Sequence, residues 1–106
     1  MIAKVRTLEV STDEIDTGIA YLRTEMLPVA REVDGFRGMI GLVDRASGKA
    51  VTVTLWQTEA ALEASEQAGA RLRRRGGAPP HQAVVERYEV ALTELSDELV
   101  GSGGPS

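Results

Sequence analysis

Residues 34–65 read DGFRGMIGLVDRASGKAVTVTLWQTEAALEAS, and this stretch decides the fold. It contains two runs, 36–44 and 50–57, that are rich in the β-branched and aliphatic residues typical of strands. The short connection between them carries Gly48, and a glycine in such a connection indicates a tight turn. The stretch therefore predicts a β-hairpin.

The only tryptophan of the chain, Trp56, lies at the point where the second strand gives way to helix-forming residues. Thr58 stands where a helix cap is expected, and the predicted helix runs from Glu59 to about Arg75. Two roles remain open for the large indole ring. It can anchor the strand end by packing, or it can form the wall of a ligand cavity.

On the N-terminal side, residues 2–10 are predicted to form another strand. Ser11 and Glu14 then have the spacing of a capping box, and apolar residues recur at helical intervals over 15–33. Pro28 falls inside this helix and is expected to kink it, because proline has no N–H to donate to the preceding turn.

On the C-terminal side, a glycine- and proline-rich break at 76–80 precedes a predicted long strand over 82–95. The element order is β-α-β-β-α-β, which predicts an α+β, ferredoxin-like domain with two helices on one face of a four-stranded antiparallel sheet. We expect one domain over residues 1–95 and a disordered tail over 96–106.

Composition narrows the function classes. The chain of 106 residues has a net charge of −4, whereas general nucleic-acid and membrane-surface binders are normally basic. It has no apolar run long enough for a transmembrane helix and no cysteine for a disulfide or thiolate site. We expect a cytoplasmic protein with neither nucleic acid nor membrane as a partner.

Strand residues alternate between the two faces of a sheet. The strand that ends the hairpin divides into two alternating sets, Val51, Val53 and Leu55 against Thr52, Thr54 and Trp56. The apolar set is assigned to the helices, which predicts that Trp56 lies on the uncovered face. The neighbouring strands carry apolar groups on both faces, so the uncovered face is predicted to pair with a second copy in a homodimer.

The Gly-Phe-x-Gly stretch at 35–38, the hairpin, and the strand that ends in Trp56 before a Glu- and Ala-rich helix resemble the antibiotic biosynthesis monooxygenase superfamily. The element order matches over 1–95, and the specific likeness lies between about 34 and 66. The resemblance implies a dimeric α/β barrel, with a cleft between sheet and helices in each subunit. Its members include cofactor-independent oxygenases of polyketide quinones, haem-degrading enzymes and proteins without an established reaction.

Oxygenation without a cofactor requires an electron-rich substrate, polar groups that favour its deprotonation, and a dry pocket. The resemblance therefore implies a small aromatic ligand, no metal and no cofactor. Tyr88 could instead be a core residue, Arg6 a surface cation and His81 a solvated loop residue. The catalytic candidates are Trp56, Tyr88 and Arg6, and the candidates for substrate binding are Thr52, Thr54, Arg37 and His81.

Haem-degrading members are usually described with an asparagine in the first strand and a tryptophan and a histidine on the second helix. This chain has no asparagine, and residues 59–75 contain neither tryptophan nor histidine. We therefore do not expect haem degradation by that route. The alternative to an oxygenase is a non-catalytic dimeric barrel that binds a small ligand or serves a stress-related or regulatory role. A cleft filled by Met26, Met39 and Phe36 would favour this alternative.

Overall fold

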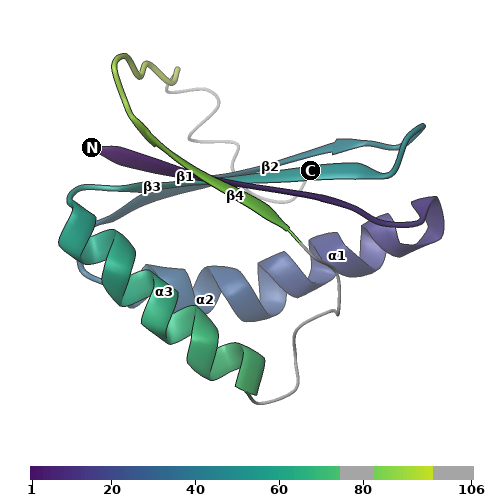
Figure 1. Ribbon diagram of the computed structural model, residues 1–106, viewed down its shortest axis with the longest axis horizontal. Coiled ribbons are helices and arrows are strands. Elements are labelled where there is room, and N and C mark those ends of the chain that lie inside the picture. Colours follow the sequence, from purple (N-terminus) through teal and green to yellow (C-terminus); the bar gives the residue numbers. More distant parts are fainter. Residues whose placement is uncertain (75–82, 97–106) are drawn as a thin grey trace.

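The computed structural model describes residues 1–74 and 83–96, and it has the predicted α+β, ferredoxin-like architecture. A four-stranded sheet forms one layer, and the helices lie together against one of its faces (Figure 1). His81 and the predicted tail beyond residue 96 fall outside the described residues. The elements in chain order are β1 (Ile2–Glu9), η1 (Thr12–Glu14), α1 (Ile15–Tyr21), η2 (Leu22–Met26), α2 (Leu27–Arg31), β2 (Phe36–Asp44), β3 (Lys49–Trp56), α3 (Glu59–Arg74) and β4 (Val84–Glu89).

The strands are ordered β2-β3-β1-β4, and every neighbouring pair is antiparallel. The last strand ends at Glu89, well before the predicted end at residue 95. Among the described strands, β4 neighbours β1, and the N–H of Val90 donates to the carbonyl of Met1 over 2.9 Å. The ladder between β1 and β4 ends at the pair Ile2–Glu89.

The first helical segment changes its winding along its length. A π-helical turn, η2, lies directly before Pro28, and the N–H of Leu27 reaches the carbonyl of Leu22 five residues back. Pro28 cannot donate to the carbonyl of Thr24, and the wider turn lies where this bond is missing. The predicted kink is thus a change of helical pitch.

Caps fix the helix starts as predicted. The carboxylate of Glu14 accepts hydrogen bonds from the N–H of Ser11 over 3.1 Å and from its hydroxyl over 2.7 Å. At the start of α3, the hydroxyl of Thr58 accepts from the N–H of Ala61 over 3.1 Å. Ser11 follows β1 and Thr58 follows β3, so these bonds lie where each strand gives way to a helical segment.

The predicted assignment of the two faces of β3 is wrong. Trp56 is 2% exposed and packs in one cluster with Ala30 of α2 and Leu62 of α3, so it faces the helices. Alternation places Thr54 and Thr52 on that same side. The more apolar set, Val51, Val53 and Leu55, lies on the face that the helices leave open.

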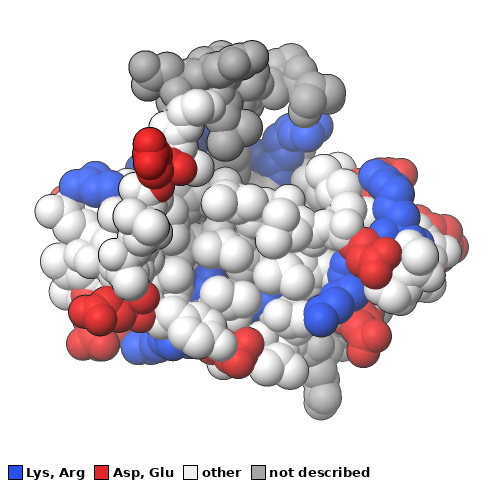
Figure 2. All heavy atoms as spheres, turned by 90° about the horizontal axis from the view of Figure 1, so that it is seen from above, with Lys and Arg blue, Asp and Glu red and all other residues white. Residues whose placement is uncertain are grey.

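The open face of the sheet is apolar and exposed. Side chains that remain at least two-fifths exposed there include Ile40 and Leu42 of β2 and Val84 and Tyr88 of β4. Figure 2 views the molecule from this side and shows uncharged side chains across its middle, with most charged groups toward the rim. Together with the uncharged side chains between them, these residues form a continuous apolar patch, whereas the apolar residues on an ordinary protein surface are scattered singly.

Gly35 joins the helical layer to the sheet. Its φ is 95°, a backbone angle that residues other than glycine rarely adopt. Its carbonyl accepts a hydrogen bond from the N–H of Gln57 over 2.8 Å. A Cβ at this position would lie 2.7 Å from the Cβ of Ala61 on α3. The close approach of α3 to the start of β2 therefore needs glycine here.

We expect Gly35→Ala to lower the free energy of unfolding by about 2–4 kcal/mol, through backbone strain plus overpacking against Ala61. The matched control is Gly18→Ala in α1, where an added Cβ meets nothing within 4 Å. That change should raise stability by about 0.5–1 kcal/mol. Urea denaturation measures both, and equal changes in the two variants would contradict the packing argument.

Candidate functional site

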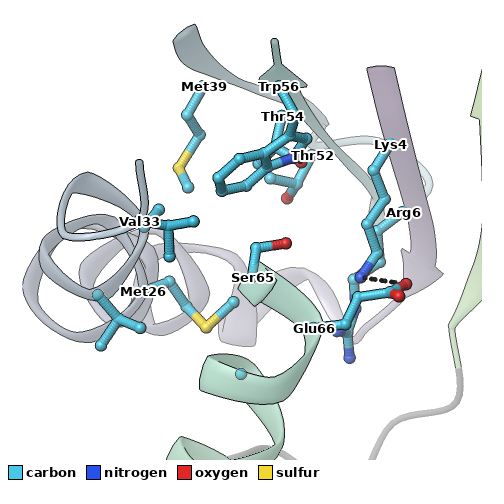
Figure 3. A pocket seen from close by; sticks show the side chains of 13 residues that line it. Lys4, Arg6, Met26, Val33, Met39, Thr52, Thr54, Trp56, Ser65 and Glu66 are labelled. Carbon is cyan, nitrogen blue, oxygen red and sulfur yellow. Dashed lines mark hydrogen bonds and ion pairs between the residues drawn. The ribbon is translucent and has the colours of Figure 1, made fainter. Parts of the chain in front are cut away.

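A cavity of about 70 Å³ lies between the sheet and the helices. One side of it is apolar, with the ring of Trp56 facing two methionines and the valines of α2 and the following turn (Figure 3). The apolar lining residues are Met26, Val29, Ala30, Val33, Met39 and Trp56. The cavity thus has an aromatic wall next to flexible thioether side chains, which adapt to irregular shapes.

Trp56 is held at this wall by two contacts. Its indole N–H donates to the hydroxyl of Thr54 over 2.9 Å, and its ring meets Phe36 edge to face with the centroids 5.4 Å apart. Trp56 therefore packs in the core, as predicted for a strand anchor, and also lines the cavity.

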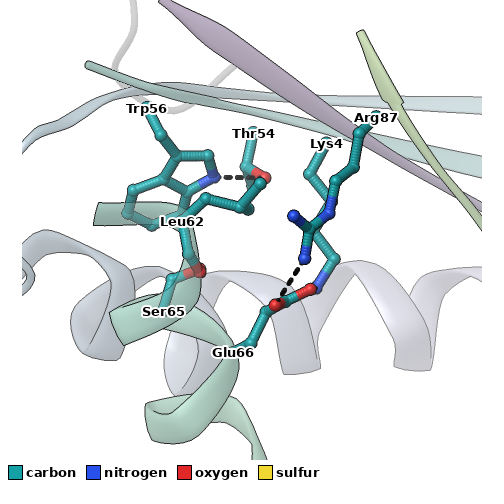
Figure 4. A network of polar contacts seen from close by, with 7 residues as sticks. All are labelled: Lys4, Thr54, Trp56, Leu62, Ser65, Glu66 and Arg87. Atoms are coloured by element: carbon teal, nitrogen blue, oxygen red, sulfur yellow. Dashed lines mark hydrogen bonds and ion pairs between the residues drawn. The ribbon is translucent and has the colours of Figure 1, made fainter. Parts of the chain in front are cut away.

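The other side of the cavity is polar and cationic. Lys4 and Arg6 line it from β1, and Glu66 lines it from α3. The Glu66 carboxylate contacts the Lys4 ammonium over 3.4 Å with one oxygen and accepts from Arg87 of β4 over 2.8 Å with the other (Figure 4). A single carboxylate therefore links three elements at the cavity edge.

Small residues on α3 leave the space that becomes the cavity. Ser65 and Gly69 line it one helical turn apart, and the Ser65 hydroxyl donates to the carbonyl of Leu62 within the helix. Small side chains allow a helix to approach its neighbour closely. At Ala61, α3 does approach Gly35 closely, but further along the helix the small side chains leave a void.

Four of the predicted site residues are brought together. Trp56, Thr54 and Thr52 of β3 line the cavity together with Arg6 of β1. The register explains this grouping, because Arg6 pairs with Thr52 and the alternating residues share one face.

Two other predicted site residues, Tyr88 and Arg37, lie elsewhere. Tyr88 pairs with Ala3, is 51% exposed and lies on the open face. The hydrogen bond from its hydroxyl to Glu86, together with the negative charge of that carboxylate, raises the pKa of Tyr88 above its ordinary value. Arg37 is exposed and donates to the side chain of Gln57.

Lys4 and Glu66 are cavity residues that the sequence does not single out. The position of Lys4 could have been predicted, because it lies two residues before Arg6 in β1 and therefore shares its face. That of Glu66 could not, since its position opposite Lys4 depends on how α3 crosses the sheet. Within residues 1–74 and 83–96, no cluster of His, Cys, Asp or Glu is arranged to hold a metal ion.

Among the helices that the structure describes, none is long and apolar enough to cross a membrane.

We expect Thr54→Val to lower the free energy of unfolding by about 1–3 kcal/mol, because the buried indole N–H loses its acceptor. Thr52→Val is the control, since Thr52 lines the same cavity without bonding the indole. Urea titrations followed by the fluorescence of the single tryptophan measure both variants. If the two variants lose the same stability, the indole bond does not hold the wall in place.

No protein-family model matches the chain. In Mycobacterium tuberculosis strain H37Rv, the uncharacterized protein Rv2557 is 35% identical over 94 residues, which cover 84% of this chain and 40% of that protein. The uncharacterized protein Rv2558 of the same strain is 35% identical over 91 residues, which cover 85% of this chain and 39% of that protein. The chain thus spans about two-fifths of the length of these curated relatives.

Three solved structures share the architecture. The heme-degrader MhuD (Rv3592) of Mycobacterium tuberculosis, with two hemes in its active site, has a TM-score of 0.70 and 20% identity, covering 89% of this chain and 99% of its own. An antibiotic biosynthesis monooxygenase has a TM-score of 0.65 and 18% identity, with coverages of 87% and 100%. The ActVA-Orf6 monooxygenase of Streptomyces coelicolor, in complex with nanaomycin D, has a TM-score of 0.65 and 20% identity, with coverages of 89% and 92%. The chain has the fold of the antibiotic biosynthesis monooxygenase superfamily.

Proposed function

We propose that this protein binds a small aromatic metabolite in the cavity and oxygenates it without a metal or an organic cofactor. The observation that carries the proposal is the pairing of an aromatic wall, Trp56, with the two cations Lys4 and Arg6 across one cavity. The wall suits a flat ring, and the cations suit the negative charge that such a ring acquires on deprotonation. One neighbour with this fold was solved with an organic ligand, nanaomycin D, which supports ligand binding but not the size of the ligand.

A hydroquinone illustrates the chemistry. Loss of a hydroxyl proton gives a phenolate whose ring carbon can react directly with oxygen. One oxygen atom then joins the ring and the other leaves as water, so that hydroquinone and O₂ give hydroxyquinone and H₂O, with all four electrons supplied by the substrate. In this scheme Arg6 and Lys4 stabilise the anion, and Glu66, the carboxylate among the described residues that line the cavity, accepts the proton.

A second candidate function is ligand binding without a reaction. It is supported by the small volume of the cavity and by the side chains of Met26 and Met39 that project into it. In a protein that only binds its ligand, the aromatic wall and the cations contribute to affinity and not to catalysis.

Oxygen consumption separates these two candidates. With a panel of hydroquinones and an oxygen electrode, we expect the protein to consume O₂ faster than the uncatalysed autoxidation. Arg6→Met should lower kcat/KM about 10²-fold, because it removes a charge aimed at the developing anion.

The control is Arg45→Gln, which removes a cation outside the cavity. Arg45 pairs with Asp16 over 3.0 Å at the surface, and both side chains are mostly exposed, so the activity should not change. Oxygen consumption no faster than autoxidation for every hydroquinone would remove the oxygenase proposal and leave the binding function.

We also propose that the protein is a homodimer in which two sheets pack through their open faces. The support is the exposed apolar surface of that face, which includes Leu42 at 52% and Val84 at 63% exposure. Covering it with a second copy gives each sheet two packed faces, and a two-fold axis lets one patch serve both partners.

The substitution Ile40→Glu should convert the dimer to a monomer at micromolar concentration. Two buried carboxylates, one from each partner, raise the dissociation constant by about 100-fold or more. Val43→Glu is the control, because Val43 is equally exposed at 41% but belongs to the opposite face of β2. Analytical ultracentrifugation measures both, and a wild-type protein that sediments as a monomer would refute the pairing.

A further inference from the structure

We propose that the cavity selects a small organic anion with no more than one ring, whose carboxylate takes over the contact that Lys4 makes with Glu66. This inference rests on the proposed ligand-binding function of the cavity and names the class of ligand. Its basis is the charge, the geometry and the size of the site.

The charge at the cavity is opposite to that of the whole chain. The chain carries a net charge of −4, yet two cations, Lys4 and Arg6, and one carboxylate, Glu66, line the cavity. Arg87 adds a further cation at the cavity edge, where it is bonded to Glu66. An apolar wall such as the ring of Trp56 has a low dielectric constant and therefore strengthens the local positive field. This field favours the binding of an anion.

The geometry allows Lys4 to change partners without breaking the whole network. Lys4 and Arg87 contact different oxygens of Glu66, at 3.4 Å and 2.8 Å. The longer contact belongs to Lys4, whose side chain is 19% exposed and lines the cavity. A ligand carboxylate can therefore take the Lys4 ammonium while Glu66 keeps Arg87 and so keeps α3 tied to β4 (Figure 4).

The size of the cavity limits the ligand. An apolar cavity of about 150 Å³ can hold benzene, whereas this one measures about 70 Å³. A single ring requires the side chains of Met26 and Met39 to move aside, which their flexible thioethers permit. A fused ring system needs still more room, and on one side the cavity is bounded by Trp56, which is 2% exposed in the core.

Isothermal titration calorimetry of the full chain tests the inference with three probes: benzoate, its neutral analogue benzyl alcohol, and the two-ring acid 2-naphthoate. Benzoate should bind about tenfold more tightly than either of the others. Lys4→Met should weaken benzoate about tenfold and leave benzyl alcohol unchanged. Glu66→Gln should strengthen benzoate severalfold, because it removes the competing carboxylate.

Arg45→Gln is the control for net charge, since it alters the total charge as Lys4→Met does but lies outside the cavity. It should leave all three affinities unchanged. Circular dichroism checks that Glu66→Gln is folded, and if it is not, the three probes on the wild type and on Lys4→Met decide the question.

The outcomes distinguish this inference from the function on which it rests. Equal affinities for benzoate and benzyl alcohol would overturn the anion site while the aromatic cavity remained. Tighter binding of 2-naphthoate than of benzoate would overturn the limit to one ring. Binding of none of the three probes would overturn both the inference and the proposed binding function.

Discussion

The packing of Trp56 between the sheet and the helices is the constraint on which the rest of the structure depends. Its indole lies in one cluster with Ala30 of α2 and Leu62 of α3. Because side chains alternate along a strand, this contact also turns Thr54 and Thr52 toward the helices. The β1–β3 register then brings Lys4 and Arg6 to the same side. A slip of one residue in β3 would exchange its two faces and remove the cavity lining altogether.

Local patterns in the sequence predicted the architecture well. The hairpin around Gly48, the cap at Thr58 and the Ser11–Glu14 pair depend on residues close together in the chain. The end of β4 was not predictable in this way, because it depends on where the partner strand β1 begins. The π-helical turn before Pro28 had only the proline as a signal, and a proline predicts a disturbance without specifying its form.

The faces of the sheet were predicted incorrectly for a physical reason. The assignment of the more apolar set of β3 to the helices assumes that the helix-covered face is the more apolar of the two. Here the helix-covered face carries threonines and the stems of Lys4 and Arg6, since it encloses a cavity. Trp56 and the two threonines were therefore grouped correctly but placed on the wrong side. Glu66 could not be found, because its contact with Lys4 joins residues far apart in the sequence.

The same alternation links the cavity to the open face. Each strand has a fixed number of inward positions, and in β1 and β3 most of them line the cavity, namely Lys4, Arg6, Thr52, Thr54 and Trp56. The apolar residues of these strands consequently point outward, with Val51 and Val53 of β3 beside Ile40 and Leu42 of β2. Full burial of a large aliphatic side chain contributes about 1.5–3 kcal/mol. Several such residues on each of two copies can offset the cost of association, about 4–15 kcal/mol. A polar, partly hollow inner face and an apolar outer face are thus two results of one strand pattern, and the proposed pairing of two copies would bury the apolar face.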